Sequence, residues 1–302
     1  MTHHLSRIPG PTLTVVCALA SLAPQPGRAE VLVETESLYH HIIVEANGSV
    51  RSMLFRRRGT DNSESVVDLS APLRPQMEYT RLMFSALFYC DQPKDILVIG
   101  LGGGTLSTML AHYFPEASVV TVELDPVVAE LAAKHFAFKQ GPKNKVEVRD
   151  GRVYVKRALR QPTPRFDLIM LDAFRGGYIP FHLTTKEFLT ECKQLLKPAG
   201  IVVANLRPGF DTYEYQRRTM NAVFGTGEAF GGSSNVAVCT LPAGKPVPEQ
   251  ELSKRARALQ ARHRFEFDLP AVVDTRQRQP DYPQQGDILT DDYAPVNIER
   301  RR

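Results

Sequence analysis

Three carboxylates in the sequence follow predicted β-strands. Glu123 ends the strand in VTVELD, Asp150 opens the segment DGR after the next strand, and Asp172 follows the apolar run of FDLIMLDAF. An open α/β sheet binds its ligand at the carboxyl ends of its strands. A carboxylate there can accept hydrogen bonds from hydroxyl or amino groups, or it can remove a proton. These positions predict a site for a polar, hydroxyl-bearing ligand.

A cluster of glycines joins the first strand of this series to a helix. The stretch DILVIGLGGGTLSTML places Gly100, Gly102 and Gly104 in that turn. A dinucleotide fingerprint has its third glycine three positions after the second, where this chain has Thr105. The loop therefore argues against a cradled diphosphate, although its backbone can still approach a bulky ligand closely. A tight strand-to-helix turn without a ligand is the alternative interpretation.

The acidic residues have structural alternatives as well. We expect Glu123, with its neighbour Leu124, to accept hydrogen bonds from the vicinal hydroxyls of a ribose. Asp150 can accept a hydrogen bond from an adenine amino group while Gly151 lets the backbone pass the base. Asp150 can equally cap the following helix, as Asp125 is expected to do before Pro126.

Asp172 is the candidate for chemistry. A lone carboxylate at the end of a buried strand costs free energy unless it is solvated or paired, so its position favours a functional role. The loop after it, RGGYIPFHLTT, contains two glycines and Tyr178 and is typical of a lid over such a site.

Alternating strands and helices must position these residues. We expect strands at 96–100, 118–123, 145–149, 166–172 and 200–205, a late strand at 235–241, and helices near 104–113, 126–138, 151–160, 184–197, 211–224 and 249–263. The alternation predicts an α/β fold: a Rossmann-like, methyltransferase-type, mostly parallel sheet with helices on both faces.

A small N-terminal β domain precedes this sheet. Two β-rich runs surround Asn47-Gly48, which is a strong hairpin signal. The spacing of apolar residues becomes that of a helix over 70–90. We therefore expect a β-hairpin domain at 30–75 and a nucleoside-binding domain at 76–302. The Pro- and Gln-rich segment 243–285 has no functional interpretation beyond its one helical run.

Composition excludes several classes of function. The net charge is +4 over 302 residues and is spread along the chain, so no nucleic-acid footprint is expected. The four cysteines form no CxxC motif or Cys/His cluster, so no metal is expected.

The N-terminus resembles a secretory leader. Arg7 precedes the apolar stretch 13–23, and small residues follow up to Ala29. The stretch is too short to span a membrane. We expect residues 1–29 to be a signal peptide and the protein to be exported to the periplasm, with a cytoplasmic protein and a mis-assigned start as the alternative. No span is expected in the mature chain.

The combined motifs resemble the spermidine synthase (polyamine aminopropyltransferase) family, in particular its spermidine-synthase-like bacterial branch. The similarity rests on the segments YTRLM, ILVIGLGGG, VELDPVV, DGRVYVKRAL, DLIMLDAF, GYIPFHLTTKEFL and LTDDYAPVN. The family transfers an aminopropyl group from decarboxylated S-adenosylmethionine to a diamine such as putrescine, without a metal. The resemblance implies that Asp172 is the base, that Glu123 binds ribose and that Asp150 with Gly151 meets adenine. It places Tyr79 and Tyr178 at the substrate, and it implies a homodimer.

The chain departs from the family at several positions. Gly103 stands where synthases have an acidic residue facing the aminopropyl amine, and Arg175 replaces an aspartate that helps to hold the diamine. The Tyr-His pair of the family reads Tyr79-Thr80, and its glutamine before the N-terminal helix corresponds to Glu64. A like charge near the diamine costs about 4 kcal/mol at 4 Å and an effective dielectric of 20.

Three functions remain open on the sequence. The first is an aminopropyltransferase. The second is a methyltransferase that uses intact S-adenosylmethionine, because Gly103 and Arg175 would leave room for, or attract, the carboxylate of that ligand. The third is a non-catalytic nucleoside- or polyamine-binding protein, which export favours because S-adenosyl nucleosides are made in the cytoplasm.

Overall fold

The computed structural model describes residues 29–162, 165–225, 227–241 and 244–293. The expected leader therefore lies outside the described residues, apart from Ala29. None of the described helices combines the length and the apolar character that crossing a membrane requires.

A four-stranded antiparallel sheet opens the chain and contains the predicted hairpin. Its strands follow one another in space in the order of the sequence: β1 (Glu30–Glu36), β2 (His41–Asn47), β3 (Val50–Arg57) and β4 (Thr60–Asp68). Asn47 is the last residue of β2 and pairs with Val50, so the turn itself is Gly48-Ser49. Gly48 has a positive φ of 58°, the left-handed conformation in which a glycine is favoured.

The second sheet has seven strands and alternates with helices along the chain. Its elements are α1 (Glu78–Met83), the 3₁₀ helix η1 (Phe84–Phe88), β5 (Asp95–Ile99), α2 (Thr105–Tyr113), β6 (Ser118–Glu123), α3 (Pro126–His135), β7 (Asn144–Val148), α4 (Gly151–Ala158), β8 (Phe166–Leu171), the 3₁₀ helix η2 (Phe181–Leu183), α5 (Lys186–Leu195), β9 (Leu196–Leu206), α6 (Tyr213–Phe224), β10 (Glu228–Gly231), β11 (Val236–Cys239), α7 (Glu249–His263) and α8 (Pro270–Asp274).

The strand order in this sheet is β10-β11-β9-β8-β5-β6-β7. The five strands from β9 to β7 are mutually parallel, while β11 and β10 add antiparallel strands at one edge. The order reverses beside β5, because β6 lies on one side of it and β8 on the other. Such a switch point is where open α/β sheets bind ligands.

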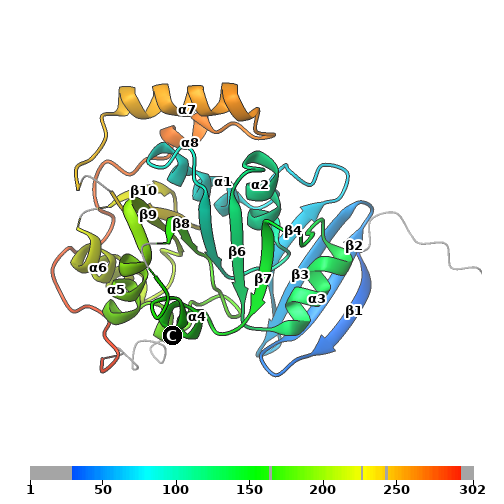
Figure 1. Cartoon of the computed structure of the whole chain (residues 1–302). Helices are drawn as coiled ribbons and strands as arrows, with labels where there is room; N and C mark the ends of the chain where they lie inside the picture. Colours follow the sequence, from blue (N-terminus) through cyan, green and yellow to red (C-terminus); the bar gives the residue numbers. More distant parts are fainter. Residues whose placement is uncertain (1–28, 163–164, 226, 242–243, 294–302) are drawn as a thin grey trace, which may run out of the picture.

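Apolar side chains cover both faces of the sheet. On one face the cluster includes Phe84 of η1, Met109 of α2 and Leu252 of α7. On the other face it includes Phe188 of α5 and Met220 of α6. In Figure 1, α7 and α8 lie on the side of α2, and the N-terminal sheet packs beside α3. The predicted mostly parallel α/β architecture with a small β unit before it is confirmed.

Prolines explain where the predicted helices were too long. The helical period over 70–90 gives a helix only from Glu78, because Pro72 and Pro75 interrupt the segment before it. The helix expected to reach 197 ends at Leu195, since Pro198 favours extended backbone in the residue before it and β9 begins there. Strand β10 and helix α8 were not predicted.

Candidate active site

A cleft opens at the carboxyl ends of β5, β6, β7 and β8, under the loop that follows β8. Eight of the ten predicted site residues line it: Tyr79, Gly100, Gly102, Glu123, Leu124, Asp150, Gly151 and Asp172. The N-terminal sheet contributes to the same cleft through residues of β3 and β4. The cleft therefore lies between the two sheets and collects residues that are far apart in the sequence.

The glycine loop is shaped by close backbone contacts. Gly100 has a φ of 103°, and a side chain there would place its Cβ 2.3 Å from the backbone oxygen of Asp172. Only a glycine allows β5 and β8 to end this close together. Gly104 lies outside the cleft lining: it adopts a left-handed conformation before α2 and packs against the ring of Phe138. Gly104 thus has a packing role here, and its contact with a ligand stays a prediction.

Glu123 is buried at the end of β6 and is tied to the loops beside it. The backbone N–H of Leu101 donates to one carboxylate oxygen at 2.9 Å, and the N–H of Asp125 donates to the other at 2.9 Å. Burial raises the pKa of Glu123, while these backbone hydrogen bonds work to lower it. A carboxylate oxygen can accept a second hydrogen bond, so Glu123 can hold the glycine loop and still face a ligand.

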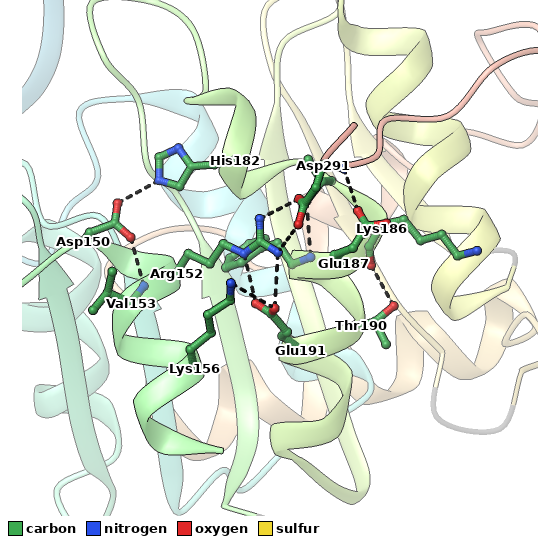
Figure 2. A network of polar contacts seen from close by, with 12 residues as sticks. Asp150, Arg152, Val153, Lys156, His182, Lys186, Glu187, Thr190, Glu191 and Asp291 are labelled. Atoms are coloured by element: carbon green, nitrogen blue, oxygen red, sulfur yellow. Dashed lines mark hydrogen bonds and ion pairs between the residues drawn. The ribbon is translucent and has the colours of Figure 1, made fainter. Parts of the chain in front are cut away.

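Asp150 both caps a helix and faces the lid. Its Oδ1 accepts from the N–H of Val153 at 2.9 Å, which confirms the predicted cap of α4. Its Oδ2 contacts Nε2 of His182 at 2.7 Å, so the loop after β8 is tied to the end of β7 (Figure 2). The hydrogen bond from His182 is the main cause that lowers the pKa of Asp150.

A charged network holds α4 in place next to this pair. Arg152 of α4 contacts both carboxylate oxygens of Glu191 on α5, at 3.1 and 3.2 Å, and both of Asp291, at 2.6 and 2.7 Å (Figure 2). Asp291 also accepts from the hydroxyl of Thr185 at 2.8 Å. A guanidinium with two bidentate partners is geometrically well defined. The network therefore fixes the helix that begins at Asp150 and Gly151.

Asp172 lines the cleft. It follows β8 directly, and the amide of Asn205 donates to its Oδ1 at 2.9 Å. Burial raises the pKa of Asp172 to about 7, although Asn205 and the Tyr79 hydroxyl work to lower it. A base with a pKa near the operating pH is well suited to proton transfer.

Three of the departures from the family pattern have clear structural settings. A Cβ on Gly103 would lie 2.6 Å from both the ring of Phe136 and the hydroxyl of Ser65, so this position opens no space for a ligand carboxylate. Thr80 is buried in the core, 2% exposed. Arg175 does line the cleft, and its guanidinium donates to the backbone oxygen of Tyr39 at 3.4 Å.

Tyr178 lies outside the cleft lining, and its contact with the substrate stays a prediction. The guanidinium of Arg57 lies 4.5 Å from the centre of the Tyr178 ring. The backbone oxygen of Tyr178 accepts a hydrogen bond from the N–H of Arg175 at 2.8 Å. The tight turn through Gly176 and Gly177 directs the ring toward β3. Tyr178 thus docks the lid on the N-terminal sheet.

Several lining residues were missed in the sequence analysis. His40 stacks on Phe55 with ring centres 4.1 Å apart and contacts Asp125 through Nδ1 at 2.9 Å. Its side chain is 7% exposed, and among the described residues Nε2 has no hydrogen-bond partner. Asn205 could have been found, because it lies near the end of a predicted strand as Asp172 does. His40 gives no such signal, since only tertiary contacts bring it to the cleft.

Within the described residues, no three His, Cys, Asp or Glu side chains gather in a way that could hold a metal ion. The cysteines there, Cys90, Cys192 and Cys239, are free thiols.

Comparisons with known proteins agree on the family. The model of the spermine/spermidine synthase domain matches residues 76–244. A polyamine aminopropyltransferase of Vibrio vulnificus is 33% identical, with 90% of this chain and 92% of that protein covered.

Two solved structures are similar to the chain. A probable spermidine synthase from Corynebacterium glutamicum aligns with a TM-score of 0.63 and 24% identity, over 77% of this chain and 87% of that one; at this identity it shows the fold alone. Human methyltransferase-like protein 13, in complex with SAH, aligns with a TM-score of 0.56 and 27% identity, over 62% of this chain and 93% of that one.

Proposed function

The chain belongs to the spermine/spermidine synthase family, and on that premise we propose that it transfers an aminopropyl group from decarboxylated S-adenosylmethionine to an amine such as putrescine. The observation that supports this most directly is the position of Asp172 in the cleft that Glu123 and Asp150, the expected nucleoside-binding residues, also line. The likeness to an aminopropyltransferase also covers more of this chain than the likeness to a methyltransferase.

The proposed reaction needs one proton acceptor. The lone pair of the amine nitrogen attacks the methylene carbon next to the sulfonium, the carbon–sulfur bond breaks, and sulfur keeps the bonding pair as the thioether of 5′-methylthioadenosine. The proton that the amine loses passes to the carboxylate of Asp172. Glu123 would hold the ribose and Asp150 with Gly151 the adenine, which places the electrophilic carbon near that base.

The test combines binding with turnover. S-adenosylmethionine, its decarboxylated form and 5′-methylthioadenosine are titrated by calorimetry, and release of methylthioadenosine is then measured with putrescine present. Asp172→Asn should lower turnover by roughly 10²- to 10⁴-fold, the usual contribution of a general base, without loss of nucleoside binding. Asp211→Asn is the matched control, because Asp211 is exposed and outside the cleft lining.

The other functions predict different results. Tight binding of intact S-adenosylmethionine alone, with methyl transfer, would favour the methyltransferase. Nucleoside binding without any turnover would indicate a non-catalytic binding protein, and binding of none of the three nucleosides would contradict the proposed use of the cleft.

Localisation and assembly are separate proposals. We propose export through cleavage after Ala29, supported only by the leader-like sequence, with a cytoplasmic location as the alternative. The mass of the mature chain checks this: it should begin at Glu30, and an intact Met1 or Thr2 start would contradict export. A homodimer is proposed from the family resemblance, and sedimentation would test it.

A further inference from the structure

An irregularity in β4 sets Glu64 apart from its neighbours. Along the β3–β4 ladder Met53 pairs with Ser65 and Leu54 pairs with Ser63, so Glu64 has no partner on β3. The extra residue forms a β-bulge. Bulges beside functional sites redirect a side chain that a regular ladder would place elsewhere. The bulge here presents Glu64 to the cleft that Asp172 also lines.

The carboxylate of Glu64 is partly buried and has no partner of its own. Among the described residues, no hydrogen bond or ion pair reaches it within the usual distances. Withdrawing a charge from water without compensation costs free energy, so a side chain of this kind is expected where a ligand supplies the missing contact. The ligand that compensates a carboxylate most effectively is a cation that donates hydrogen bonds.

The charged and titratable groups around Glu64 come from three other elements. Asp172 follows β8 and Tyr79 lies on α1, while Arg207 follows β9. Burial raises the pKa of Glu64 to about 7, the charge of Asp172 raises it further, and Arg207 works to lower it. Arg207 stacks on Phe210 at 4.8 Å from the ring centre, and Arg175 on the lid donates to the backbone oxygen of Tyr39. Among the described residues, neither arginine is within ion-pair distance of Glu64, although the charge of Arg207 still acts on it.

We propose that Glu64 is the carboxylate that binds the ammonium group of the amine acceptor, next to the base Asp172. This inference rests on the proposed aminopropyl transfer. It gives the acceptor a counter-charge that Arg175 does not provide, and it takes that charge from the N-terminal sheet instead of the central one. Glu64 is therefore a specificity-determining residue that selects cationic amines.

The binding of such a cation should release protons. At pH 7 a carboxyl group with a pKa near 7 is about half protonated, and an ammonium group placed beside it favours the ionised form. Part of a proton from Glu64 then passes to the buffer when the amine binds.

The first experiment separates the acceptor from the donor. Steady-state kinetics give kcat and KM for putrescine, and calorimetry gives the affinities for methylthioadenosine and for decarboxylated S-adenosylmethionine. Glu64→Gln should raise the KM for putrescine by roughly 10- to 100-fold, the range expected for losing a hydrogen bond to a charged group. Both nucleoside affinities should stay within about twofold of the wild type, and Glu64→Asp should restore part of the loss.

Glu45→Gln is the matched control, because Glu45 is on β2 of the same sheet and outside the cleft lining. An unchanged KM in Glu64→Gln would overturn the inference. A loss of affinity for decarboxylated S-adenosylmethionine, with methylthioadenosine unaffected, would also overturn it, because Glu64 would then bind the ammonium of the donor.

A second measurement distinguishes this inference from the proposed function. Putrescine is titrated by calorimetry into the protein saturated with methylthioadenosine, in buffers of different ionisation enthalpy. The dependence of the binding enthalpy on the buffer gives the number of protons released. If turnover is absent but binding and proton release depend on Glu64, the inference stands and the proposed reaction fails. If the wild type turns over and Glu64→Gln behaves like it, the inference alone fails. No binding of putrescine and no turnover would overturn both.

Discussion

The pKa values of Asp167, on β8, and of Asp172, directly after it, are shifted in opposite directions. Asp172 follows the carboxyl end of β8, where burial raises its pKa to about 7. Asp167 is near the other end of β8. Burial works to raise its pKa as well, but hydrogen bonds from Lys197 and from the backbone of Lys94 and Asp95 outweigh it and lower the pKa. An ionised aspartate is thus destabilising at the carboxyl end of β8 and stabilising near its amino end.

The stability of the protein should reflect this contrast. The pKa of Asp172 is about 7 in the folded state and ordinarily 3.8, so the folded state binds more protons than the unfolded state between these pH values. The stability that protonation of Asp172 contributes is therefore lost as pH rises through 7. Asp172→Asn should raise the melting temperature at pH 8 on the order of 5 °C, and the gain should shrink toward pH 4. Asp167→Asn should lower it at pH 8. Thermal melts from pH 4 to 8 check both, and a Asp172→Asn gain that grows toward acid pH would contradict the assignment.

The residues that the sequence indicated and those that it missed differ in how they reach the cleft. Glu123, Asp150 and Asp172 end strands, so the topology of a parallel sheet brings them together. Arg207 directly follows β9, so the same rule could have indicated it. His40 follows no such rule, because packing of the N-terminal sheet places it. Gly104 and Tyr178 make internal contacts outside the cleft lining, and their contacts with a ligand stay predictions.

At the scale of elements, the glycine loop depends on how closely β5 and β8 end. Gly100→Ala would force a Cβ against the backbone of Asp172 and would require a strained positive φ. We expect the strand ends to separate, with a loss of at least tenfold in methylthioadenosine affinity and a stability loss of about 2–4 kcal/mol. Calorimetry and denaturant unfolding measure the two effects.

Gly48→Ala is the control for backbone strain alone. Gly48 also has a positive φ, but nothing lies within 4 Å of the position of its Cβ. It should cost only about 1–2 kcal/mol and leave nucleoside affinity unchanged. Equal effects of the two substitutions on binding would show that the contact with Asp172 is irrelevant.

The helices and strands were predictable where their period was regular, and their limits were less so. Alternating apolar runs predicted β5 to β9 and the helices between them, and α7 was predicted at its observed bounds. The bulge at Glu64 could not be predicted from the spacing of apolar and polar residues. One extra residue in a strand of mixed polarity does not change that spacing recognisably. Strand β10 is only four residues long, and its pairing with β11 depends on tertiary packing.

At the scale of the whole molecule, the N-terminal sheet and the central sheet share an apolar core. Met53 and Phe55 of β3 pack with Val128 and Leu131 of α3 in one buried cluster. The cleft is also lined from both sides, by Glu64 on one and Asp172 on the other. Loss of the contact between the sheets should therefore damage the site and the fold together.

We expect one cooperative thermal transition for the whole chain. Methylthioadenosine at 100 times its dissociation constant adds about 2.7 kcal/mol to the free energy of unfolding, which should raise the melting temperature by roughly 5–10 °C.

Leu131→Ala should cost about 2–5 kcal/mol and also weaken nucleoside binding, because α3 supports the N-terminal sheet. Leu259→Ala removes an equally buried leucine from α7, away from the cleft, and should lower the melting temperature without changing affinity. Two separate transitions, with only one shifted by ligand, would show that the sheets unfold independently and that the cleft does not couple them.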